Sequence, residues 1–232
     1  MQELYLLSVS AASLGVIHTI LGPDHYLPFI VLSKARQWSS NKTMWITFIS
    51  GVGHVGSSIL IGILGVTLGV SLSKLENIEA FRGELVGWML FAFGVLYTLY
   101  GIYKYIKTSH HAHLPDFLLP KKIRGLQHLP VDEQTGDNSR LTPWVLFLIF
   151  VFGPCEVLIP MLIFPAYKNS TLGMFTVALI FGIATISTMM LTVYLGHKGT
   201  SLLKFKKHER YLHLLAGLVI LSSGTGILFL GW

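Results

Sequence analysis

Six side chains that can bind a metal ion lie in three short segments of an otherwise apolar chain: His18, Asp24, His25, His54, Cys155 and Glu156. Two of them, Asp24 and Glu156, are carboxylates deep inside apolar segments, where an ionised group costs at least about 2.5–3.5 kcal/mol in a bilayer and therefore suggests function. Imidazole suits nickel, copper, zinc and iron, carboxylate suits harder ions, and thiolate suits softer ones. The mixed set therefore predicts a site for a divalent transition-metal ion.

Four of these residues are also compatible with a purely structural role. His54 could be a packing residue whose ring bonds a neighbouring carbonyl group, and Cys155 could be a small buried apolar side chain. Asp24 and His25 could form a pair that holds a helix break together. Ser57-Ser58, further along, is expected to allow close helix packing without any chemical role.

The composition indicates a membrane protein. Hydrophobic residues make up 52% of the 232 residues and charged residues only 12%, whereas soluble domains carry about 25% charged residues. Basic residues exceed acidic ones, 17 to 11, but they lie in short gaps between apolar runs, which argues against nucleic-acid binding. The single cysteine excludes an internal disulfide, a cysteine-pair zinc site and an intramolecular dithiol relay.

An all-α polytopic protein with six transmembrane helices is expected, since about 20 apolar residues are needed to cross the bilayer. The six segments are Leu4–Ser33, Met44–Ser71, Gly83–Tyr103, Thr142–Tyr167, Leu172–Gly196 and Tyr211–Trp232. The first lacks the basic start of a secretory signal and is too long for one. The spans form two halves, residues 1–105 and 142–232, joined by a polar linker over 106–141.

The distribution of basic residues predicts orientation. Of the 17 Lys and Arg residues, 14 lie in the gaps after the first, third and fifth spans. The positive-inside rule then puts both chain termini outside the cytoplasm and the linker inside it, in a cell-membrane protein. The linker carries His110, His111, His113 and His128, which could collect metal or simply be tolerated in water.

The two halves carry matching residues at a nearly constant offset. Gly22-Pro23 matches Gly153-Pro154 at an offset of 131, and further markers match at 130: Ser57-Ser58 with Ser187-Thr188, Glu79 with Glu209, and Gly87, Gly94 and Gly101 with Gly217, Gly224 and Gly231. Three spans per half is an odd number, so the repeats should be inverted relative to each other. Inverted repeats with paired interrupted helices are typical of secondary transporters. Proline interrupts a helix, so we expect breaks at Pro23 and Pro154, facing protein or a cavity.

Two segments resemble the nickel/cobalt permeases. The segment His18-Thr-Ile-Leu-Gly-Pro-Asp24-His25 is similar to their histidine followed by Asp-His in an early span, and Gly53-His54-Val55-Gly56-Ser57-Ser58 is similar to their Gly-His-Ser-Ser/Thr segment. Gly153-Pro154-Cys155 with Pro160 resembles the efflux branch and the wider lysine-exporter superfamily. That superfamily includes sulfite-exporter-like, urease-accessory-type and thiol-redox membrane proteins.

A membrane transporter that moves nickel or cobalt by alternating access is the leading hypothesis, with the metal as substrate and no bound cofactor. The alternative is an exporter of a small anion such as sulfite or an organosulfur acid, which helix N-termini would favour and two carboxylates would repel. A thiol–disulfide enzyme needs exchanging cysteines, and only one is present; no enzyme activity is expected. An accessory subunit stays open. The expected partners are the metal ion and the lipid bilayer, with a homo-oligomer also compatible and no nucleic acid.

Overall fold

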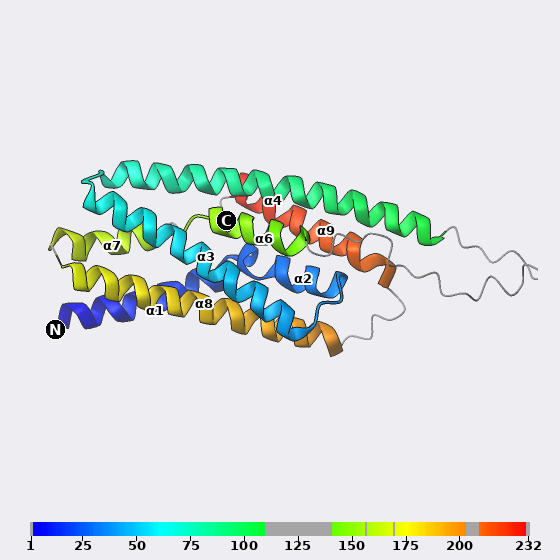
Figure 1. Cartoon of the computed structure of the whole chain (residues 1–232), viewed down its shortest axis with the longest axis horizontal. Helices are drawn as coiled ribbons and strands as arrows, with labels where there is room; N and C mark the ends of the chain where they lie inside the picture. The colour runs from blue at the N-terminus through cyan, green and yellow to red at the C-terminus, as the bar shows by residue number, and fades with distance from the viewer. Residues whose placement is uncertain (1, 110–140, 156, 169, 203–208, 231–232) are drawn as a thin grey trace, which may run out of the picture.

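The structure is a computed structural model that describes residues 2–109, 141–155, 157–168, 170–202 and 209–230. All regular elements in these ranges are helical (Figure 1). In chain order they are α1 (Gln2–Leu21), the 3₁₀ turn η1 (Pro23–His25), α2 (Leu27–Ala35), α3 (Ser40–Thr67), α4 (Leu72–Ser109), α6 (Leu141–Phe152), α7 (Leu158–Tyr167), α8 (Thr171–Leu202), α9 (Glu209–Thr225) and the π-helical turn η4 (Gly226–Leu230). Most of the predicted linker over 106–141 falls outside the described ranges.

Within the described residues, five helical segments are long and apolar enough to cross a membrane. They are Gln2–Leu21, Ser40–Thr67, Leu72–Ile106, Thr171–Thr200 and Tyr211–Leu230. Helices satisfy their backbone groups internally, as lipid requires, and many large apolar side chains on them are exposed. The chain is therefore an all-helical, multi-pass membrane protein. The predicted fourth span, Thr142–Tyr167, is not among the five, because it is divided at the expected break into two short helices, α6 with 12 residues and α7 with 10.

The expected interruption at Pro23 is present. Helix α1 ends at Leu21, and the backbone N–H of Gly22 makes the last hydrogen bond, to the His18 carbonyl at 3.0 Å. Pro23 has no N–H to continue the helix, and the chain forms the single turn η1, closed by a 3.1 Å bond from the His25 N–H to the Gly22 carbonyl. Helix α2 then begins with a proline in its first turn, where no donor is needed.

The interruption at Pro154 is present as well. Helix α6 ends at Phe152, and the Gly153 N–H bonds the Phe150 carbonyl at 3.0 Å. The chain becomes helical again at Leu158, whose N–H bonds the Cys155 carbonyl at 2.9 Å. Because a helix is broken in each half, four helix ends lie partway along the bundle and not at its two outer ends (Figure 1).

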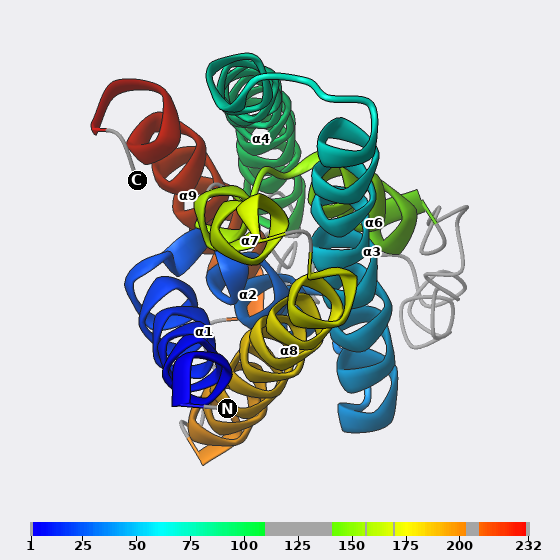
Figure 2. The same cartoon turned by 90° about the vertical axis from the view of Figure 1, so that its left-hand side faces the viewer.

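The short helices that follow the two breaks lie near the centre of the molecule. Seen along the bundle, α2 and α7 are surrounded by α1, α8, α3, α4 and α9 (Figure 2). Phe29 and Leu32 of α2 and Leu158 of α7 are completely buried. This position keeps the interrupted backbone away from lipid, which could not bond its free polar groups.

The predicted start of the third span is wrong, because the helix begins earlier in the sequence than the prediction. It was expected at Gly83, but α4 begins at Leu72, so Glu79 and Arg82 lie within a helix. Their charges made this stretch look like a connection. The two side chains form an ion pair and are buried inside the protein. Their charges are therefore not exposed to lipid, and the helix can continue through this stretch.

Helices α4 and α9 approach each other closely at glycines. A Cβ atom added to Gly94 would lie 2.5 Å from the backbone nitrogen of Leu221, and one added to Gly224 would lie 2.5 Å from that of Phe91. Any larger residue at these positions would force the backbones apart. The two contacts are equivalent under the offset of 130, because Gly94 corresponds to Gly224 and Phe91 corresponds to Leu221.

A second pair of contacts follows the same rule. A Cβ at Gly217 would lie 2.6 Å from the backbone of Thr98, and one at Gly87 would lie 2.9 Å from the Leu228 side chain. These pairs are also exchanged by the offset of 130. Contacts later in α4 involve earlier positions in α9, so the two helices run antiparallel. The glycines thus form a reciprocal seam, which we call the α4–α9 seam.

Replacing Gly94 with alanine should destabilise the protein by about 1–3 kcal/mol, because the new methyl group meets backbone that cannot rotate away. The measurement is thermal unfolding of the purified protein in detergent. Gly56→Ala is the matched control, since a Cβ at Gly56 of α3 meets nothing within 4 Å. An unfolding temperature for Gly94→Ala equal to that of the control would contradict the tight seam.

Candidate metal site

Three histidine rings from the first half of the chain meet beside the first break. His18 lies in the last turn of α1, His25 in η1 and His54 in the middle of α3. The His25 ring centroid is 4.8 Å from that of His18 and 5.1 Å from that of His54, with edge-on geometry in both pairs. His25 and His54 are both 4% exposed. The break therefore brings together rings that are far apart in the sequence.

Cys155 approaches two of these rings, those of His18 and His54, from the second break. One ring nitrogen of His18, one of His54 and the Cys155 sulfur all lie within 4.8 Å of one another. Cys155 is completely buried. Metal bonds to nitrogen and sulfur are about 2.0–2.3 Å long, so a bound ion would draw these donors closer together. The site thus joins the two halves of the chain.

Hydrogen bonds fix which ring nitrogen can accept a cation. His54 Nδ1 is 3.3 Å from the Phe150 carbonyl oxygen, and His25 Nδ1 is 3.2 Å from the Gly22 carbonyl oxygen. A carbonyl accepts only from N–H, so Nδ1 carries the proton and Nε2 keeps a lone pair. The Nε2 atoms of His18, His25 and His54 are buried and have no hydrogen-bond partner among the described residues. Buried polar atoms without a partner are rare in proteins and call for a ligand or ion.

Asp24 lies next to His25 and faces the cavity. Its Oδ1 atom is 3.2 Å from His25 Nδ1, and its side chain is 25% exposed. A carboxylate in this place orients the imidazole and raises its basicity as a ligand. A cavity of about 730 Å³ adjoins the site and is lined by Asp24, the three histidines, Glu84 and mostly apolar side chains.

The structure thus brings His18, His54 and Cys155 together, with His25 against both other rings and Asp24 beside His25. Glu156 lies outside the described residues. His110, His111, His113 and His128 of the linker lie outside them too. The ligand role of each residue stays a prediction. The bond to a neighbouring carbonyl group, which was the structural alternative for His54, is present.

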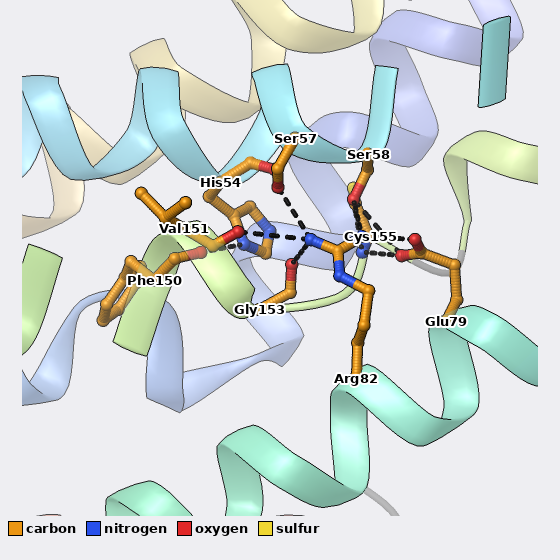
Figure 3. A network of polar contacts seen from close by, with 9 residues as sticks. All are labelled: His54, Ser57, Ser58, Glu79, Arg82, Phe150, Val151, Gly153 and Cys155. Atoms are coloured by element: carbon orange, nitrogen blue, oxygen red, sulfur yellow. Dashed lines mark hydrogen bonds and ion pairs between the residues drawn. The ribbon is translucent and has the colours of Figure 1, made fainter. Parts of the chain in front are cut away.

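Sequence reasoning missed a buried polar network behind the site, centred on Arg82 of α4 (Figure 3). Arg82 pairs with Glu79, and its Nη1 atom donates to the Ser58 hydroxyl at 3.1 Å. Its Nη2 atom donates to the Ser57 hydroxyl at 2.7 Å and to the carbonyl oxygens of Val151 and Gly153 at 3.2 and 3.0 Å. The guanidinium group thus bonds α3, α4 and the second break at once.

Glu79 completes this network. It is 1% exposed, and its Oε2 atom accepts from the backbone N–H of Cys155 at 3.0 Å and from the Ser58 hydroxyl at 3.2 Å. Ser57-Ser58 therefore has a polar role, and the expectation of packing alone was wrong. The available signal was the opposite charges three residues apart, which place both side chains on one helix face.

A family model described as cytochrome C biogenesis protein transmembrane region matches residues 27–227. The matched range includes His54 and Cys155 but begins just after the first break. Comparisons with curated proteins and with solved structures gave no significant match. The description does not name nickel or cobalt, and it agrees with the wider group of lysine-exporter-like and thiol-redox membrane proteins expected from the sequence. Since the match covers most of the 232 residues, the chain belongs to the cytochrome c biogenesis transmembrane region family.

Proposed function

We propose that this protein is a membrane transporter for a divalent transition-metal ion, with nickel or cobalt as the first candidates. One observation carries the proposal: three imidazoles have buried Nε2 atoms without hydrogen-bond partners among the described residues, and ring nitrogens of two of them, His18 and His54, lie within 4.8 Å of the Cys155 sulfur. Lone pairs on nitrogen and sulfur attract a borderline or soft cation. Asp24 adds negative charge next to the rings, which offsets part of the charge of the ion.

Passage of an ion requires access from one side at a time. The cavity beside His18, His25 and His54 offers a route to the site, and Glu84 on its wall would attract cations. The thiol of Cys155 must lose its proton to bind strongly, so metal binding would release protons. Proton exchange is therefore the coupling that we propose, and the protein is not proposed to be an enzyme.

An inverted repeat of two three-span halves is the architecture we propose for alternating access. Each half has the same order of elements: an interrupted helix, then two long helices. The antiparallel α4–α9 seam supports a two-fold axis, because its contacts are exchanged by the offset of 130. An axis that relates antiparallel spans lies in the membrane plane, as in inverted-repeat transporters.

Two other functions fit the described site less well. An anion exporter would need N–H or cationic groups facing its substrate, whereas the site presents lone pairs and a carboxylate. The family description concerns cytochrome c biogenesis, and a thiol–disulfide role there would require this chain to exchange with a cysteine of another protein, since it has only one.

Removing one of the histidines should weaken metal binding by at least about tenfold. The experiment titrates purified wild-type protein, His25→Ala and His54→Ala with nickel, cobalt, zinc, manganese and sulfite, followed by calorimetry. His197→Ala is the matched control, because His197 lies on α8 and bonds Ser33 away from the site. Flux of the bound metal into vesicles should likewise be lower with His25→Ala and His54→Ala than with wild type and His197→Ala.

Binding of sulfite without binding of any metal would replace the metal transporter with the anion exporter. Equal metal binding and equal flux in wild type and in His54→Ala, at equal protein levels, would also contradict the proposal.

We also propose that both termini lie outside the cytoplasm of a cell-membrane protein. The ends of α2, α4 and α8, which adjoin the basic connections, lie toward the same end of the bundle (Figure 1). A cysteine introduced as Ser109→Cys in a Cys155→Ala background should resist a membrane-impermeant thiol reagent on intact cells. Ser71→Cys, between α3 and α4, should react. The reverse labelling would invert the topology.

A further inference from the structure

The second break is held in place by side chains, beyond the hydrogen bonds of its own backbone. Arg82 bonds the carbonyl oxygens of Val151 and Gly153, which no longer have helical partners, and Glu79 accepts from the Cys155 N–H. These contacts use two positions of α4 that lie on one helix face, and both side chains are almost fully buried. We call Glu79 and Arg82 the charge clamp.

The charge clamp also holds the part of α3 that carries His54. Arg82 donates to the hydroxyls of Ser57 and Ser58, which follow His54 by one turn. On the other side, the backbone of the break packs against the His54 ring: a Cβ at Gly153 would lie 2.8 Å from His54 Nδ1. His54 and Cys155 are therefore fixed relative to each other by one set of contacts.

The first break has a different support. The offset of 130 relates Arg82 to Leu212, which has no polar group to donate. The Gly22 carbonyl is bonded by the backbone and ring of its own neighbour His25. The clamp therefore distinguishes the two halves, although both carry a break.

We propose that Glu79 and Arg82 are positioning residues that aim the Cys155 thiol at the histidine rings. This inference rests on the proposed metal site and adds the residues that hold its sulfur donor in position. Arginine suits the task because its planar group donates to several acceptors in fixed directions, which lysine cannot do. Loss of the clamp should let the second break relax, so that a metal ion keeps its nitrogen ligands and loses sulfur.

Cobalt(II) bound to the purified full chain distinguishes these ligands by absorption. Thiolate gives a ligand-to-metal charge-transfer band, and the ligand-field bands report the overall coordination. Wild type should show both, and Cys155→Ala should lose only the charge-transfer band. Arg82→Lys, which keeps the charge, should lower the charge-transfer intensity at least fivefold while the bound cobalt per chain stays unchanged.

Ser58→Ala is the second variant, since it removes a partner of both Arg82 and the Cys155 N–H without leaving a buried charge unpaired. It should also lower the charge-transfer band relative to wild type, and it serves if Arg82→Lys does not fold. Glu3→Gln with Lys168→Gln is the matched control, because that ion pair is exposed and away from the site. Its spectrum should equal that of wild type.

The outcomes separate the two proposals. Wild-type protein that binds no cobalt, and none of the other metals, would overturn the proposed function. Wild-type protein that binds cobalt without a charge-transfer band would remove Cys155 as a ligand and the inference with it. A charge-transfer band of wild-type intensity in Arg82→Lys, or in Ser58→Ala if that variant alone folds, would show that the clamp is only structural.

Discussion

An interrupted helix leaves backbone N–H and carbonyl groups that lipid cannot bond, and most of this structure follows from satisfying them. At the first break the task falls on the turn itself, where His25 bonds the Gly22 carbonyl with both its backbone and its ring. At the second break a buried arginine supplies the missing donors. Both solutions need protein on all sides, which is why the short helices α2 and α7 occupy the centre of the bundle.

The same hydrogen bonds prepare the candidate site. A ring that donates from Nδ1 to a carbonyl group directs its Nε2 lone pair elsewhere, and His25 and His54 both do so. The structural and the metal-binding interpretations of His54 are therefore compatible, since the packing bond selects the tautomer that a cation needs. Cys155 is likewise both a buried apolar side chain and a sulfur near two rings.

The breaks and most of the cluster could be predicted from sequence because their signals are local: a proline, or an ionisable residue, inside an apolar run. For the charge clamp, the sequence could indicate the pairing of Glu79 with Arg82, but not their burial against the second break. Apart from Glu79, the partners of Arg82 are 24 to 71 residues away in the sequence, and its charge next to a short connection resembled a helix flank. Its burial depends on acceptors that exist only once α3, α4 and the second break have packed together.

The α4–α9 seam limits how the two halves can move. The backbone of each helix packs directly against glycines of the other, so if α4 slid along α9, side chains would clash with the facing backbone. Rotation about the line of contact preserves these glycine contacts and disturbs the packing much less. In the proposed alternating-access cycle the seam would serve as the hinge, and the opening should be largest where α1 packs against α8, on the far side of the bundle from α4 and α9.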